Sequence, residues 1–143
     1  MQLGKGKFFR RKTAQRRGTV LIETALVLPL LLVLAFGVIE FGACISLEHN
    51  LKGAAYAGCR AGISPGFTSN FQVEAAVSTL MEEIGISSSN YTVVTDPVDL
   101  SIALPGDTVT VSVECRWGTV GTRPMGLINA DKNIRATAVM QKE

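Results

Sequence analysis

The stretch Arg16-Arg17-Gly18-Thr19-Val20-Leu21-Ile22-Glu23 decides the architecture that we predict for this chain. It joins a basic N-terminal segment to an apolar run that continues from Thr24 to Ile45. As a helix, that run would be about 33 Å long, slightly more than a hydrocarbon core of about 30 Å. The sequence therefore predicts a membrane-spanning helix, preceded by a polar leader and followed by a small folded part.

The charges of the chain are distributed unevenly along it. Seven basic residues and no acidic residue precede Glu23, although the net charge of the whole chain is only +2. From Leu47 onward, seven basic and ten acidic residues give a balance of −3. Lysine and arginine are retained on the cytoplasmic side of a membrane, so this asymmetry predicts a cytoplasmic N-terminus. A nucleic-acid-binding arm is the disfavoured alternative, because such an arm rarely leads into a membrane-length apolar segment.

Two other kinds of export signal fit the N-terminal region less well. The apolar core of a secretory signal peptide has about 7–15 residues, and no clear small-x-small cleavage site follows the longer run found here. A lipoprotein signal would need a cysteine close behind a short apolar run, whereas Cys44 comes too late. The basic segment is therefore predicted to precede a true membrane helix.

Glu23 places a carboxylate at the start of the apolar region. A charge there costs a few kcal/mol unless it finds a partner or reaches the interface. If the chain were cut after Gly18, Thr19 would carry a new α-amino group about 6 Å from Glu23 along the helix axis. Pairing with the amine of a neighbouring subunit would favour registered assembly. The alternative, a boundary residue that extends to the headgroups, stays open on charge alone. For Glu40 we expect a position near the outer interface, with a role in subunit pairing as the alternative.

The segment Gly18–Glu23, followed by Thr24-Ala25-Leu26-Val27-Leu28-Pro29-Leu30-Leu31-Leu32, resembles the signal of type IV pilins. More narrowly, it looks like that of the TadE-like minor pseudopilins of the tight-adherence (Flp) pilus system. The stretches Phe36–Gly42 and Ile134–Glu143 also resemble the helix end and the C-terminal strand of that family. Thr24 departs from the family pattern, in which an aromatic or small apolar residue is commoner.

The resemblance implies a processed structural subunit. A membrane prepilin peptidase would cleave with Gly18 on the leaving side and Thr19 as the new N-terminus, and Glu23 would take the assembly role. Membrane lipid, the peptidase and other pilin-like subunits, or copies of this chain, are the implied partners. The implied location is the bacterial inner membrane, crossed once, with the C-terminal domain outside. Whether the chain enters the surface filament or only assists its assembly stays open.

The predicted fold class is α+β and pilin-like. Residues 1–18 are the leader, residues 19–45 the transmembrane helix and residues 46–143 an extracytoplasmic domain. The apolar stripe predicts that the first helix continues to about Ala61, and Ser69 with Gln72 fits a capping box that opens a second helix. Period-two alternation predicts three or four antiparallel strands packed on the outer half of the long helix, at residues 91–95, 98–104, 108–117 and 133–141.

Alternation within residues 108–117 predicts which side chains are buried. Val109, Val111, Val113 and Cys115 would face the core, and Thr110, Ser112, Glu114 and Arg116 would face water.

The chain has three cysteines, and an exported domain lies in a compartment that permits disulfides. A Cys59–Cys115 bridge is one hypothesis, because both residues are expected on faces where the helix meets the sheet. Two free buried thiols are the alternative. Cys44 is expected in or near lipid, either free or in a link between subunits.

No catalytic constellation is visible in the sequence. The cysteines and the single histidine do not have the spacing of a metal site, and no phosphate-binding glycine loop follows a strand. We therefore expect no enzymatic activity, no cofactor and no small-molecule substrate. A structural pilin-like subunit is the first hypothesis, and an uncleaved single-pass protein whose outer domain is a binding module is the second.

Overall fold

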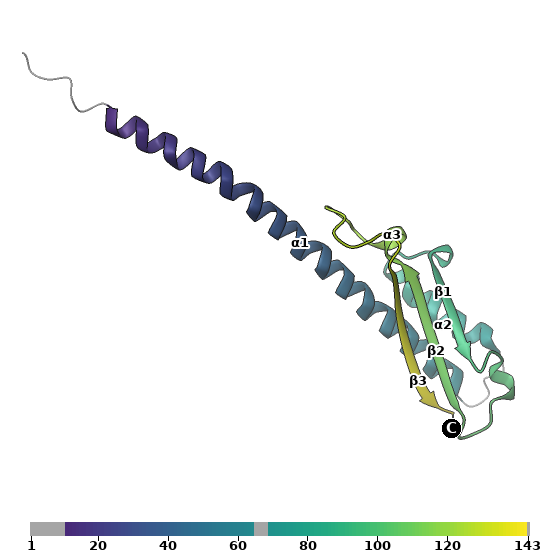
Figure 1. The fold of residues 1–143 in the computed structure, drawn as a ribbon. Coiled ribbons are helices and arrows are strands. Elements are labelled where there is room, and N and C mark those ends of the chain that lie inside the picture. Colours follow the sequence, from purple (N-terminus) through teal and green to yellow (C-terminus); the bar gives the residue numbers. More distant parts are fainter. Residues whose placement is uncertain (1–10, 65–68, 143) are drawn as a thin grey trace, which may run out of the picture. The chain divides into compact units, whose positions relative to one another are not determined.

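The computed structural model describes residues 11–64 and 69–142, with side chains from Gly18 onward. Its elements are three helices and three strands joined by loops and two short 3₁₀ turns: α1 (Arg11–Ile63), α2 (Asn70–Glu83), β1 (Tyr91–Asp96), β2 (Thr108–Arg116), α3 (Trp117–Val120) and β3 (Asn133–Gln141) (Figure 1). The chain divides after Val38 into two units. The predicted α+β class, with a long apolar N-terminal helix, is confirmed.

The first unit contains the apolar part of α1. Large side chains such as Leu21, Leu26 and Leu30 are about 70% exposed, and Pro29 lies inside the helix without ending it. Within the described residues, α1 is the one helix long and apolar enough to cross a membrane, with a mean hydropathy of 2.5 over its most apolar window. These exposed aliphatic side chains fit a helix surrounded by lipid.

Helix α1 extends beyond both predicted ends. It begins at Arg11, so the Gly18–Thr19 bond lies inside a helix, and it ends at Ile63 instead of about Ala61. The predicted leader lies partly outside the described residues, which begin at residue 11.

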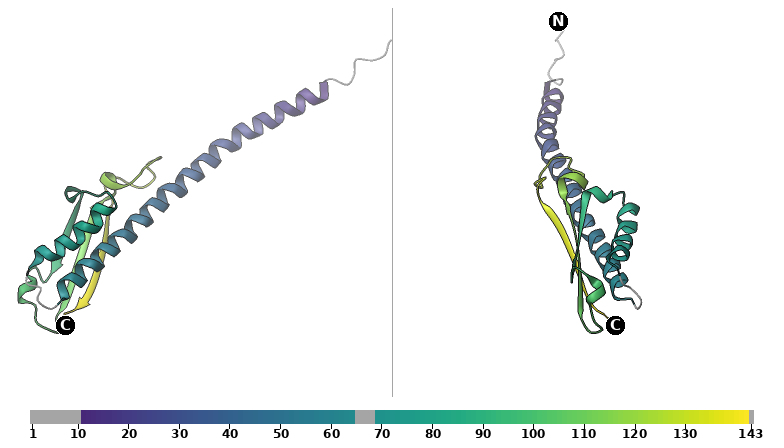
Figure 2. Two further views of the ribbon diagram at one scale, coloured as in Figure 1. Left: turned by 180° about the vertical axis from the view of Figure 1, so that it is seen from behind. Right: turned by 90° about the vertical axis from the view of Figure 1, so that its right-hand side faces the viewer.

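The second unit, residues 39–143, has two layers. Strand β2 is the centre of an antiparallel sheet in the order β1-β2-β3, with Val93 opposite Val113 and Val113 opposite Ala136. Helix α2 and the C-terminal part of α1 pack on one face of this sheet (Figure 2). The side chains predicted to face the core from β2 are all buried, and Ile134 and Ala136 of β3 join them.

Small residues on α1 allow the two layers to pack closely. Ala54 and Ala55 are fully buried, and a Cβ placed on Gly58 would lie 2.8 Å from Val77 and 3.3 Å from Val111. Gly58 therefore lies where α1, α2 and β2 meet. The space that a larger side chain would need there is already filled.

The strand predicted at residues 98–104 is absent. This segment contains a 3₁₀ turn at Leu100–Ile102, and Leu100 is buried in the core. Its backbone is satisfied by side chains, because Leu100 N–H donates to Asn70 and the Lys142 ammonium donates to the carbonyls of Leu100 and Ala103. Backbone groups that are satisfied in this way need no strand partner.

Of two further predictions, the cap at Ser69 is confirmed and the exposure of Ser112 is wrong. Ser69 does cap α2, since its hydroxyl accepts a hydrogen bond from Phe71 N–H at 3.2 Å. Ser112, predicted to face water, is only 3% exposed. Its hydroxyl lies 2.9 Å from the Thr137 hydroxyl and accepts a bond from Arg135. The cross-strand neighbours on β3 therefore cover it.

We expect Gly58→Leu to lower the free energy of unfolding of the second unit by about 1–3 kcal/mol, the usual cost of overpacking a filled core. Gly53→Leu is the matched control, because Gly53 lies on the same helix and a Cβ there would meet no described atom within 4 Å. The unfolding midpoints of the two variants are measured by thermal unfolding in detergent, monitored by near-ultraviolet circular dichroism. Equal midpoints for the two variants would contradict the close packing at Gly58.

Candidate functional site

The predicted processing residues lie on the first part of α1. Gly18 is partly buried and Thr19 is exposed. Among the described residues, a Cβ placed on Gly18 would meet nothing within 4 Å, so their packing does not require glycine there. The cleavage between these two residues stays a prediction.

Glu23 is exposed on a face of α1 that is otherwise mostly apolar. It lines a shallow groove of the helix surface together with Val20, Val27 and Leu31. Thr24 lies on the same groove, and its hydroxyl donates to the Val20 carbonyl at 2.9 Å. The hydroxyl is thus satisfied within the helix, which explains how an apolar environment tolerates this departure from the family pattern.

Glu40 has its partners within its own chain, and its predicted position near the outer interface stays a prediction. Its side chain is fully buried by the second unit of its own chain. One carboxylate oxygen accepts a hydrogen bond from Ile128 N–H at 2.8 Å, and the other accepts a longer one from Met125 N–H at 3.4 Å. The sequence did not predict these contacts, because the donors lie 85 and 88 residues further along the chain, beyond the reach of local pattern.

The connection between β2 and β3 is held at its base by backbone hydrogen bonds. Trp117 N–H donates to the Lys132 carbonyl at 2.9 Å, and Gly118 N–H donates to the Ala130 carbonyl at 2.8 Å. A Cβ on Gly118 would lie 2.7 Å from that carbonyl oxygen, so this close approach requires glycine. The strand pairing therefore continues into the start of the connection.

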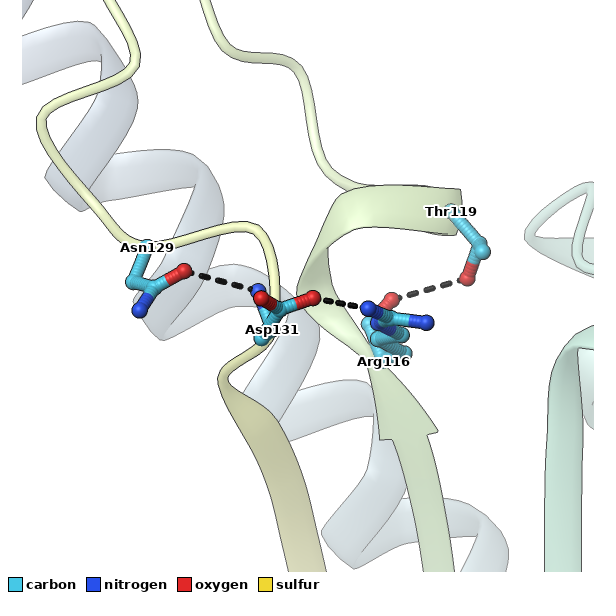
Figure 3. A network of polar contacts seen from close by, with 4 residues as sticks. All are labelled: Arg116, Thr119, Asn129 and Asp131. Atoms are coloured by element: carbon cyan, nitrogen blue, oxygen red, sulfur yellow. Dashed lines mark hydrogen bonds and ion pairs between the residues drawn. The ribbon is translucent and has the colours of Figure 1, made fainter.

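Side chains add further support to the base of this connection (Figure 3). Arg116 pairs with Asp131, Thr119 donates to the Arg116 carbonyl, and Asn129 accepts from Asp131 N–H. We call residues 121–128 the tip loop. The residues of the base flank both ends of this loop, and Glu40 accepts hydrogen bonds from Met125 and Ile128 within it. The side chains of Met125 and Leu127 are 42% and 52% exposed.

A hollow of about 300 Å³ lies beside Trp117, lined from α1 by Ala43, Ser46, Leu47 and Asn50. The Trp117 side chain is fully buried, and its Nε1–H has no hydrogen-bond partner among the described residues. The indole packs against Gly121, where a Cβ would lie 2.5 Å from the ring. The hollow thus combines an apolar wall with a few polar side chains.

The three cysteines are free thiols, so the predicted Cys59–Cys115 bridge is absent. Cys59 donates to the Val109 carbonyl at 3.2 Å, and Cys115 lies six residues further along β2. At about 3.3 Å per residue this places them roughly 20 Å apart along the strand, far beyond the reach of a disulfide. Cys44 packs at the edge of the core cluster that contains Cys115.

Burial sets the chemistry of the two inner thiols. It raises the pKa of Cys59, and burial together with the charge of Glu114 raises the pKa of Cys115. Both therefore carry little thiolate at neutral pH and pack as small apolar groups. Within the residues described, no group of three or more histidine, cysteine or acidic side chains could hold a metal ion.

We expect Glu40→Ala to speed hydrogen exchange at the Ile128 amide, because removing a hydrogen bond to a charged group typically costs about 1.5–3 kcal/mol. Glu48→Ala is the control on the same helix: Glu48 pairs with Lys52 at 2.7 Å while both side chains are largely exposed, so its removal changes little. Unchanged exchange at Ile128 in the Glu40 variant would show that the carboxylate does not hold the loop.

Comparison with known proteins gives one match. Residues 18–60 match the family model described as TadE-like protein, which confirms the resemblance inferred from the sequence. No curated protein and no solved structure matches the chain. The matched residues begin at Gly18, include Glu23 and Glu40, and end within the part of α1 that packs on the sheet. Over residues 18–60 this chain is therefore similar to the TadE-like family, whose model covers about a third of the sequence.

Proposed function

We propose that this chain is a minor pilin-like subunit, a pseudopilin, of a tight-adherence pilus or a related secretion machine. A prepilin peptidase cleaves it after Gly18, and it assembles with other pilin-like subunits or with copies of itself through helix α1. It is a structural protein without catalytic activity. It resides in the bacterial inner membrane, with its N-terminus in the cytoplasm and residues 46–143 outside.

The uncovered surface of α1 around Glu23 carries this proposal. The groove beside Glu23 is lined mostly by apolar side chains of α1. Another helix that packed there would bring its own N-terminus near the carboxylate, and an ion pair in lipid would select one register. The family match over residues 18–60, which includes Glu23, supports the proposed role of helix α1.

A binding module on an uncleaved single-pass protein is the second candidate. The hollow beside Trp117 favours it, because a buried N–H without a partner among the described residues is a group that a bound acceptor would satisfy. The intact mass of protein extracted from its native membrane separates the two candidates. Loss of residues 1–18 supports the first, and a full-length mass supports the second.

We expect Gly18→Leu to block processing, so that the intact mass stays that of the full-length chain. A Cβ at this position meets nothing within 4 Å among the described residues, so a loss of cleavage would report recognition by the peptidase. Gly53→Leu, also at an unobstructed glycine on α1, is expected to be processed normally. Normal processing of the Gly18 variant would argue against this site.

We expect Glu23→Ala to insert in the membrane but to form few or no cross-linked complexes with neighbouring pilin-like subunits. Removal of the carboxylate eliminates the proposed ion pair and makes the helix more apolar. Glu23→Asp, which keeps the charge, should recover part of the assembly. Cross-linking in native membranes measures both variants. Assembly of the alanine variant at the level of the parent would refute the ion-pair role.

A further inference from the structure

The tip loop exposes apolar side chains beside a helix that is itself apolar. Met125 and Leu127 are 42% and 52% exposed, although their neighbour Ile128 is buried in the core. On α1, within the same unit, Ile39, Phe41 and Ile45 are 53%, 57% and 67% exposed. The loop and this part of the helix therefore present apolar groups from the same region of the folded unit.

The hydrogen bonds to Glu40 fix the level of the loop along α1. Met125 and Ile128 both donate to this carboxylate, so the loop lies beside residue 40 of the helix. Residue 40 lies five residues before Ile45, where the apolar run ends, which is about 7–8 Å along the helix axis. Segments that lie in a membrane interface bury their apolar side by about 5–10 Å.

We propose that the tip loop lies in the headgroup region of the membrane, in the leaflet on the side of the folded unit. Met125 and Leu127 contact the upper acyl chains, and the exposed Arg123 lies at the level of the lipid phosphates. Glu40 anchors the loop in this position from the helix. This inference rests on the membrane-spanning helix alone and does not require processing after Gly18.

The chemistry of the loop favours the interface over the hydrocarbon core. A loop backbone carries polar groups that need water or headgroups, so it is excluded from the core of the bilayer. An arginine beside apolar side chains suits the boundary, where its charge reaches a phosphate while its neighbours meet lipid. The buried Glu40 fits the same place, because the loop amides supply partners that a carboxylate at this depth lacks in lipid.

Depth-dependent quenching tests the proposal on the full chain. The chain has one tryptophan, Trp117, which is buried and provides a constant background. Leu127→Trp places a second indole on the tip loop, and Val98→Trp is the matched control at a side chain that is 80% exposed on the connection between β1 and β2. Both variants are reconstituted in phosphatidylethanolamine–phosphatidylglycerol vesicles, with or without bromine on the acyl chains.

We expect brominated lipid to reduce the added emission of Leu127→Trp by roughly twofold or more, and to leave that of Val98→Trp at the background. Met125→Trp should behave like Leu127→Trp and replaces it if that variant does not fold. Equal quenching of the loop and control positions would overturn the proposal. Emission that changes with the protein-to-lipid ratio but not with bromine would also overturn it, and would show that the loop meets a second copy of the chain.

Discussion

One helix has to satisfy two environments, and the rest of the structure depends on how it does so. Before Val38 the side chains of α1 are exposed around the helix, which suits lipid or another helix. From Glu40 onward, one stripe of the same helix is buried against its own chain. The small residues Ala54, Ala55 and Gly58 let α2 and β2 approach α1 closely enough to form a core. The folded unit therefore needs the helix as one of its layers.

The buried carboxylate of Glu40 marks the first residue of that packed stripe. An acidic side chain in an apolar region is stabilised only when donors reach it, and here they come from the backbone of the tip loop. That loop is in turn held at its base by the extended strand pairing and by the Arg116–Asp131 ion pair. Helix, sheet and connection are thus linked through polar contacts as well as through the core. This linkage gives the two exposed apolar side chains of the loop a defined place on the folded unit.

The two acidic residues of the apolar region have different surroundings. Glu23 is exposed on a mostly apolar face of α1. Glu40 already has its partners within the chain. An acid that is satisfied internally serves the fold, whereas an exposed acid on an apolar helix remains accessible to another chain. The contrast supports the proposal that Glu23, and not Glu40, takes part in assembly.

The sequence by itself determined the long apolar helix, the second helix with its Ser69 cap, the three strands and the buried face of β2, because local periodicity and end signals predict each of them. It also carried the family resemblance in residues 18–60. Only the tertiary structure decided that Glu40 is buried, that Cys59 and Cys115 lie far apart, that Ser112 is covered and that residues 98–104 form no strand. Each of these depends on groups distant in the sequence, such as the Ile128 amide or the Lys142 ammonium, whose positions are set by packing and not by local pattern.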